Sequence, residues 1–210
     1  AVDGKILEVS NQGFARAENL LSPYLPTFDP ELYGRQGKIM DSWESVRHNP
    51  HPADFLVFEL KNRSTIAQVS LSTKFHRGNH PEAVEIEGLS ASGEWHKIIA
   101  KTELNGHALK FLPSLDNNTI FTKIRVSMFP DGGLTRLGLY KEILTDQPKN
   151  QIFSEPIPHA KKPLTPKYKG EGYKASGPGV DVACQAYGGK VISASNEHYG
   201  PAAQIISPYP

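Results

Sequence analysis

Short apolar runs separated by turn-forming residues restrict the fold of this sequence more than any other feature. The runs are about 5–8 residues long, a common length for strands joined by turns. They are bounded by Gly, Pro, Asn or Ser and cover residues 55–60, 66–72, 83–89, 95–100, 110–112, 123–129 and 134–143. In 123–129 the apolar residues alternate, which directs one face of a sheet into a core and the other into solvent. The pattern predicts an all-β protein, an antiparallel sandwich or barrel.

Little of the sequence favours helix. Residues 14–21 place Phe14, Ala17 and Leu20 on one side of one or two helical turns. Pro23 would end these turns, because proline cannot continue a helix without losing a backbone hydrogen bond. The remainder of the first 50 residues predicts loops and short turns that wrap the sheet.

A change of composition indicates a domain boundary near residue 145. From residue 149 to residue 179 the chain is rich in proline and lysine and has no periodic apolar pattern, as is typical of extended linkers. We therefore predict a β-sandwich over residues 1–145, a linker over residues 146–180 and the opening of a second unit over residues 181–210.

The sequence begins to repeat after this linker. Residues 4–14 align with residues 189–199, and residues 17–24 align with residues 202–209 at the same spacing. Ungapped similarity of this length predicts a tandem duplication. A segment as short as 189–210 buries too little apolar surface to fold alone. We therefore expect a fragment of a longer protein, the alternative being that this segment docks on the first domain or on a partner.

Charge and cysteine content make several classes of protein unexpected. The formal net charge is +1, so we expect no basic surface for nucleic acid or a membrane. No apolar run approaches the ~20 residues of a membrane-spanning helix, and residues 1–7 lack the pattern of a signal peptide. The single cysteine, Cys184, rules out an internal disulfide and is expected to be a buried structural thiol. We expect a soluble protein of the cytoplasm.

The segment 41–49 combines an indole, a carboxylate and a guanidinium. Trp43 could form an amphipathic wall, Glu44 could supply a carboxylate, and Arg47 could bind a carboxylate with two parallel hydrogen bonds. The alternative interpretation is a buried tryptophan beside an ion pair that closes one end of a sandwich.

Two further loops contain polar residues suited to ligand binding. The Gly-Asn pair that includes Asn79 supplies unusual backbone angles, and Asn79 and His80 could face a small polar ligand or form a plain connecting turn. Residues 130–133, Pro-Asp-Gly-Gly, predict a tight turn. In the simpler interpretation Asp131 caps this turn. Arg136 would bind substrate or pair with Asp131.

We expect no metal and no cofactor. His48, His51 and Asp54 could be drawn as metal ligands, but prolines at positions 50 and 52 prevent a helical pair of histidines. The sequence also lacks a glycine-rich phosphate loop and the Gly-x-Ser-x-Gly motif of a nucleophile elbow.

Four of these segments resemble motifs of the allantoicase family, in the same order and with matching spacing. They are Phe14–Leu21, Asp41–Asn49, Ser72–Pro81 and Pro130–Leu137. The resemblance extends over residues 4–142. The start of the second copy, Ser195–Gly200, also resembles the opening of the second repeat in that family.

The resemblance implies a fold, an activity and a set of site residues. The implied fold is a jelly-roll β-sandwich like galactose-binding domains. The implied activity is hydrolysis of allantoate to ureidoglycolate and urea by a homo-oligomer, with Glu44 or Asp131 exchanging protons. The implied substrate-binding residues are Trp43, Arg47, Asn79, His80 and Arg136, with Arg47 or Arg136 holding the substrate carboxylate. All are expected at one rim of the sandwich.

This chain departs from the family pattern at three positions. Ser42 stands where the family has Gly, Val46 where it has Arg, and Ser72 where it has Asp. If these positions touch substrate, this repeat is weakened and the other repeat does the chemistry. Two other functions therefore stay open, namely a non-catalytic ligand-binding module and a structural subunit that pairs with an intact copy.

Overall fold

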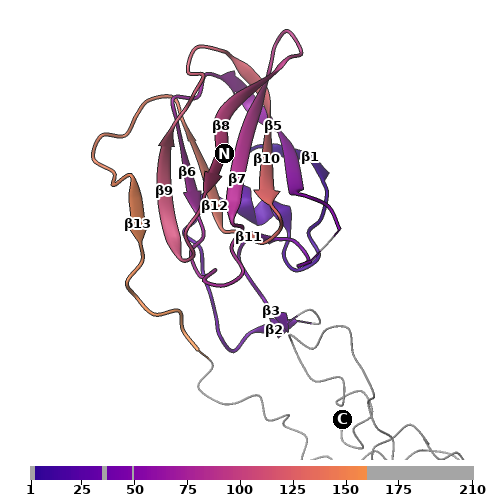
Figure 1. The fold of residues 1–210 in the computed structure, drawn as a ribbon, viewed down its shortest axis with the longest axis vertical. Coiled ribbons are helices and arrows are strands. Elements are labelled where there is room, and N and C mark those ends of the chain that lie inside the picture. Colours follow the sequence, from indigo (N-terminus) through magenta and orange to yellow (C-terminus); the bar gives the residue numbers. More distant parts are fainter. Residues whose placement is uncertain (1–2, 35–36, 49, 160–210) are drawn as a thin grey trace, which may run out of the picture. The chain divides into compact units, whose positions relative to one another are not determined.

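Two antiparallel sheets face each other across an apolar core in the computed structural model, which describes residues 3–34, 37–48 and 50–159 (Figure 1). The larger sheet has five strands in the order β1, β5, β10, β7 and β8. Their bounds are Lys5–Val9 for β1, Asp54–Ser64 for β5, Phe121–Phe129 for β10, Ala83–Ser90 for β7 and Trp95–Glu103 for β8.

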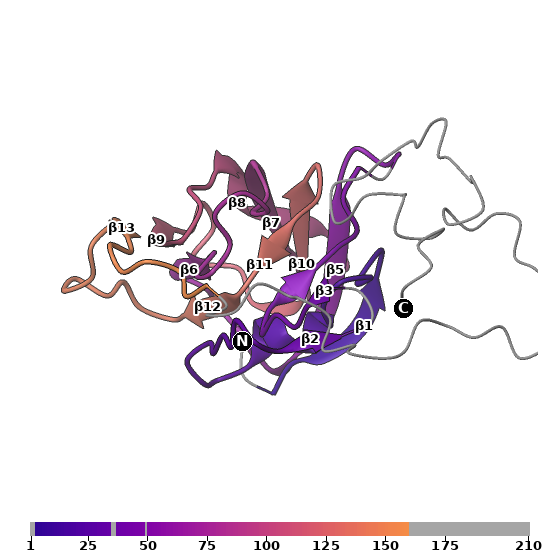
Figure 2. The same cartoon turned by 90° about the horizontal axis from the view of Figure 1, so that it is seen from below.

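The smaller sheet has four strands in the order β12, β6, β9 and β13. Their bounds are Arg136–Tyr140 for β12, Gln68–Ser72 for β6, Ala108–Pro113 for β9 and Asn150–Ile152 for β13. Two short pairs join β11 (Gly133–Leu134) to β4 (Trp43–Glu44) and β2 (Tyr33–Gly34) to β3 (Gly37–Lys38). Seen from below, the two main sheets form separate layers (Figure 2).

The chain crosses between the sheets at most of its connections. It passes from β5 to β6, back to β7, then from β8 to β9 and back again to β10. Strands β7 and β8 form a hairpin within one sheet, closed by a turn in which Gly93 has a φ of +91°. These crossings give the jelly-roll sandwich that the family resemblance implies, and they place loops from both sheets at each end of the sandwich.

Strand β10 illustrates how sequence alternation builds the core. Ile124, Val126 and Met128 are fully buried, and the residues between them are partly exposed. Val126 lies opposite Leu56 of β5 and Ile86 of β7, so the three side chains share one face of the sheet. Burial of each such side chain contributes roughly 1.5–3 kcal/mol. The alternating pattern of 123–129 therefore identifies both a strand and its core face.

The N-terminal segment differs from the helix expected over residues 14–21. A 3-10 helix, η1, occupies only Ala17–Leu21. The amides of Phe14 and Ala15 instead donate to the carbonyl of Glu44, at 3.2 and 3.1 Å. This pairing ties the segment to β4 and leaves too few residues for a longer helix.

The described fold continues past the boundary predicted at residue 145. Residues 150–152, inside the predicted linker 146–180, form β13 and pair with β9. The amide of Phe153 also donates to the carbonyl of His107 at 3.0 Å. Residues 160–180 of that linker, Cys184 and the predicted second unit 181–210 lie outside the described residues, so those predictions stay predictions.

Candidate active site

The turn at residues 130–133 lies against strand β4. Gly133 of β11 pairs with Glu44 of β4. The amide of Ser45 donates to the carbonyl of Gly132 over 3.0 Å, and the amide of Gly132 donates to the hydroxyl of Ser45 over 3.1 Å. These bonds bring together two motifs that are far apart in the sequence.

The loop that carries Asn79 contacts the same turn. The amide of Gly133 donates to the carbonyl of Asn79 over 2.8 Å. Gly132 has a φ of +140°, and a side chain on it would come within 2.6 Å of the backbone nitrogen of Pro81. Glycine is required at position 132 by both the backbone angle and the space. Three motifs therefore meet at one end of the sandwich.

Glu44 is the buried carboxyl group of this site. Its residue is 4% exposed, and its Oε1 accepts a hydrogen bond of 2.7 Å from the side-chain amide of Asn79. Burial raises the pKa of Glu44 because the charged form loses its hydration, while the Asn79 hydrogen bond and the positive charge of Arg47 oppose that rise. The balance makes Glu44 easier to protonate than an exposed glutamate.

Arg47 and Asp131 form an ion pair beside Glu44. Nε of Arg47 lies 2.5 Å from Oδ1 of Asp131, and the other carboxylate oxygen accepts the amide of His48 at 2.8 Å. The Asp131 side chain is 4% exposed and the Arg47 side chain is 27% exposed. The partners of the Asp131 carboxylate are therefore Arg47 and His48, both on the segment after β4. The expectation that Asp131 caps its own turn or pairs with Arg136 is wrong.

Arg136 lies apart from this cluster. Its Nε donates to the carbonyl of Tyr24, and its Nη1 donates to the carbonyls of Asn19, Asp41 and Thr135. Its Nη2 forms an ion pair of 2.7 Å with Asp41. These bonds use the guanidinium as a clamp between β12 and the N-terminal loops, so the structure does not bring Arg136 to the site.

Trp43 lies behind the site in the core. It is 0% exposed, and its indole N–H donates to the carbonyl of Asn11 over 2.9 Å. The side chain predicted to face substrate therefore supports β4 from the interior. The simpler interpretation, a buried tryptophan next to an ion pair, describes its placement better.

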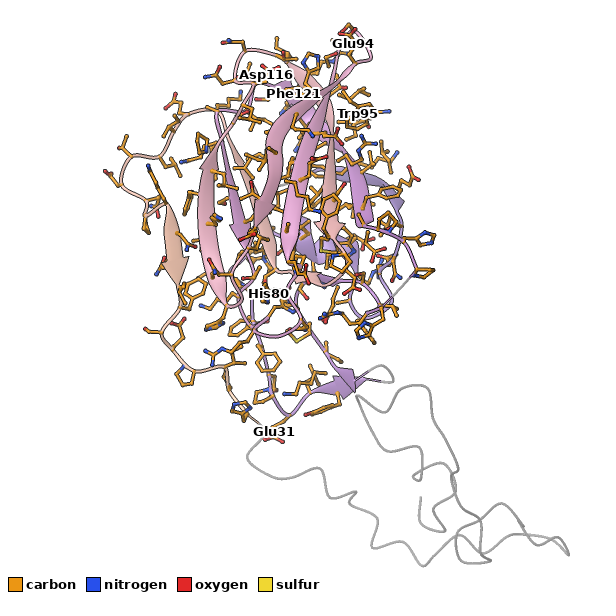
Figure 3. All side chains as sticks on the ribbon, viewed as in Figure 1. Glu31, His80, Glu94, Trp95, Asp116 and Phe121 are labelled. Carbon is orange, nitrogen blue, oxygen red and sulfur yellow. The ribbon has the colours of Figure 1, made fainter. Side chains whose placement is uncertain are left out.

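His80 is partly exposed and marks the end of the sandwich that carries the site, opposite the end with Trp95 and Asp116 (Figure 3). Burial lowers the pKa of His80, and the positive charge of Arg47 acts in the same direction. His80 also lines a cavity of about 600 Å³ together with Glu82, Ala83, Lys101, Glu103 and Leu104. Arg47, Asn79 and His80 are the partly exposed members through which a ligand would reach the cluster.

His76 is a neighbour of the site that sequence reasoning missed. It is 0% exposed, and neither ring nitrogen has a hydrogen-bond partner. Burial lowers its pKa from 6.5 to about 4, with Arg47 and His80 adding to the effect and Asn79 opposing it. The sequence held one indication that His76 lies near the site, namely its position in the same motif as Asn79 and His80.

The cluster combines a protonatable carboxyl, a cation and amide donors in a small volume. Such a set can bind an anionic group and pass a proton to a leaving atom. Within the described ranges, no group of three or more His, Cys, Asp or Glu is placed to hold a metal ion. None of the helices in those ranges is long and apolar enough to cross a bilayer.

Comparison with known proteins identifies relatives over most of the chain. The model of the Allantoicase repeat family matches residues 1–144. A probable allantoicase of Streptomyces coelicolor is 30% identical over 97% of this chain and 53% of that protein. An allantoicase of Neurospora crassa is 32% identical over 99% of this chain and 56% of that protein.

The fold is also similar to solved structures. The crystal structure of allantoicase from Saccharomyces cerevisiae matches with a TM-score of 0.59 and 29% identity. The match covers 69% of this chain and 46% of that one. The chain thus spans about half the length of the curated relatives it matches.

Proposed function

Because this chain belongs to the allantoicase family, we propose that it contributes the hydrolysis of allantoate to ureidoglycolate and urea. The observation that carries the proposal is the cluster of Glu44, Arg47, Asn79 and Asp131, in which three distant motifs supply adjoining charged and amide groups. The allantoicase relatives support the choice of substrate.

The reaction sets three chemical requirements. Allantoate has a carboxylate and two ureido groups on one carbon, and one carbon–nitrogen bond breaks as urea leaves. The departing nitrogen gains a proton, and a water oxygen bonds to the carbon after losing one. A site for this reaction therefore needs a cation for the carboxylate, an acid and base for the two proton transfers, and polar groups for the ureido oxygens.

Glu44 is favoured over Asp131 as the proton-transfer group. Its raised pKa lets a protonated fraction persist nearer neutral pH, so it can donate to the leaving nitrogen. The resulting carboxylate then accepts the proton that the attacking water gives up. Asp131 is held in the ion pair with Arg47 and accepts the amide of His48, which suits it to holding Arg47 in place.

Arg47 is favoured over Arg136 for the substrate carboxylate. Its side chain is 27% exposed, whereas that of Arg136 is 13% exposed and donates to several carbonyls. Asn79 and His80, on the neighbouring loop, are proposed to bind the ureido oxygens. Trp43 is proposed to act indirectly, by supporting β4 beneath Glu44.

The family departures do not remove the central groups. Val46 is 40% exposed and its amide donates to the side chain of Asn11, and Ser72 is buried with its hydroxyl accepting the amide of Lys74 at 3.2 Å. A non-catalytic binding module or a structural subunit would keep this architecture without turnover. A homo-oligomer and a cytoplasmic location stay predictions.

Urea release from allantoate by the 210-residue chain tests the proposal, with Glu44→Gln as the variant. Glutamine can still accept the hydrogen bond from Asn79 but cannot exchange protons, so we expect turnover to fall at least ~100-fold. Unchanged turnover in Glu44→Gln would exclude the proton-transfer role. Binding of allantoate without urea release would favour the binding module.

A further inference from the structure

We propose that His107 is a positioning residue of this site, which ties the loop of residues 73–80, the site loop, to residues 153–155 after β13, the strap. The site loop carries Asn79 and His80, and the strap lies within the segment that the sequence assigns to a linker. The effect of His107 on turnover rests on the proposed function, whereas the physical link between strap and site loop does not.

His107 holds the first part of the site loop through two hydrogen bonds. Its residue is 1% exposed, and its Nδ1 accepts the amide of Phe75 over 3.0 Å. Its own amide donates to the carbonyl of His76 over 2.6 Å. Phe75 has a φ of +70°, which costs a residue with a side chain some energy. A buried acceptor for the Phe75 amide stabilises that conformation and so helps to fix the path of the loop toward Asn79.

The residues before His107 support the rest of the site loop. The hydroxyl of Thr73 donates to the carbonyl of Asn105 over 2.6 Å. Gly106 lies so close to the loop that a side chain there would overlap the carbonyl of Arg77 and come within 2.8 Å of Nδ1 of His80. The connection between β8 and β9 therefore lies against the site loop from Thr73 to His80.

The strap binds the other side of His107. Nε2 of His107 lies 3.0 Å from the carbonyl oxygen of Glu155, and the amide of Phe153 donates to the carbonyl of His107 over 3.0 Å. The Phe153 ring packs edge-on against the imidazole, with the ring centroids 5.3 Å apart. Lys74 of the site loop forms an ion pair of 3.3 Å with Glu155 and lies over the Phe153 ring. Strand β13, paired with β9, leads directly into the strap (Figure 1).

The two partners of the imidazole determine which nitrogen carries the hydrogen. A backbone amide only donates, so Nδ1 has to offer its lone pair to Phe75. A carbonyl oxygen only accepts, so Nε2 has to carry the hydrogen that bonds to Glu155. A neutral ring in one tautomer therefore binds the site loop and the strap at the same time.

Asn79 connects the site loop to the other two motifs of the site. Its carbonyl accepts the amide of Gly133 over 2.8 Å, and its side chain donates to Oε1 of Glu44 over 2.7 Å. Exchange of the Gly133 amide hydrogen with solvent therefore reports whether Asn79 stays in place. If His107 holds the loop, a change at His107 should be detected at Gly133.

Amide hydrogen exchange in the 210-residue chain, followed by nitrogen-15 NMR, measures this coupling. In His107→Ala we expect the amides of Phe75 and Gly133 to exchange at least ~10-fold faster, with a smaller change in the central strand β10, which opens only with the whole fold. His107→Asn should exchange more slowly than His107→Ala at both amides. Asparagine offers an acceptor oxygen near the place of Nδ1 and readily adopts the φ of +53° found at this position.

Two variants at neighbouring positions form a matched pair. Phe153→Ala removes the ring that packs on His107 and should accelerate exchange at Gly133 by ~3-fold or more. Ile152→Ala removes a side chain that is 62% exposed and should leave Gly133 unchanged. This pair also provides the test should His107→Ala not fold. In the wild-type chain, the ring nitrogen signals of His107 should show the hydrogen on Nε2.

Three results would overturn the link itself. They are unchanged exchange at Gly133 in folded His107→Ala, equal effects of Phe153→Ala and Ile152→Ala, and a hydrogen on Nδ1 of His107.

The urea-release assay tests the positioning role. We expect His107→Ala to lower kcat/KM for allantoate about tenfold and His107→Asn to recover part of that loss. Wild-type turnover in His107→Ala, despite faster exchange at Gly133, would overturn the positioning role. Absence of urea release in the wild-type chain with the expected exchange pattern would contradict the proposed function and leave the link between strap and site loop supported.

Discussion

Arg47 and Asp131 face each other across 2.5 Å, one on the segment after β4 and the other in the turn before β11. The carboxylate is almost fully buried and the guanidinium is partly exposed. Removing one partner would leave the other charge poorly hydrated and without a counter-charge, which would destabilise the fold. The ion pair therefore fastens two loops and keeps one cation at the mouth of the site.

Asp131→Asn should destabilise the fold and weaken substrate binding. Asparagine can still accept the amide of His48 but leaves Arg47 without its counter-charge, so we expect a loss of about 1–3 kcal/mol in urea unfolding. Asp3→Asn is the control, because the Asp3–Lys61 pair is exposed and its loss should leave the free energy of unfolding nearly unchanged. Equal losses in the two variants would contradict this account.

Gly132→Ala should be among the most damaging small substitutions in the chain. The residue has a φ of +140° and a methyl group would lie 2.6 Å from the nitrogen of Pro81, so we expect a loss of about 2 kcal/mol or more. A methyl group added at Gly78 would meet nothing within 4 Å, and Gly78→Ala should be nearly neutral. The midpoints of thermal unfolding of the two variants test this prediction, and an equal midpoint for both would contradict it.

Arg136→Lys should lower stability without affecting substrate binding. Lysine cannot make the bonds to Tyr24, Asn19 and Asp41 together, so we expect a loss of about 2 kcal/mol. The KM for allantoate should stay unchanged. A raised KM in a stably folded variant would restore the substrate-binding role that the sequence suggested.

Acid should destabilise the fold through His76. An unfolded histidine titrates near 6.5 and the folded His76 near 4, so between these values the unfolded chain binds more protons. The contribution of His76 to the free energy of unfolding is therefore complete above pH 6.5. It is lost as the pH falls toward 4, by about 3 kcal/mol in total. The free energy of unfolding, measured with a chemical denaturant at several pH values, should decrease as the pH is lowered from 6.5 to 4.

His76→Phe isolates that contribution. His80 has a lowered pKa and acts in the same direction, while Glu44 has a raised pKa and acts in the opposite one. Both stay in the variant, so the difference between the two stability curves belongs to His76. Parallel curves between pH 6.5 and 4 would show that His76 does not titrate in the folded state as expected.

The sheet was predictable where one strand carries its own signal. In β10 the alternation of buried Ile124, Val126 and Met128 is local information, and it predicted that strand. Strand β1 of the same sheet was not predicted, because it lies in the first 50 residues, where loops and short turns were expected. Strand β4 is two residues long and exists because Trp43 and Glu44 pair with β11 and bridge to Ala15. Pairing of that kind depends on distant residues, so no local pattern could reveal it.

The site was predictable as a set of segments but not as a set of contacts. The family motifs indicated Glu44, Arg47, Asn79 and Asp131, which the structure brings together. Which arginine pairs with Asp131 depends on how two loops fold over each other, and Arg136 was therefore misassigned as its alternative partner. His76 was missed because a buried histidine in a loop-like sequence looks no different from a solvated one.

Strand β13 determines where this domain can be cut. It hydrogen-bonds along the outer side of β9 through residues 150–152. An expressed protein that ends at residue 145 would expose the unpaired amides and carbonyls of β9. An exposed strand edge of this kind can pair with another chain and lead to aggregation. A protein that ends after residue 159 would keep β13 paired with β9 and should aggregate less than one that ends at residue 145.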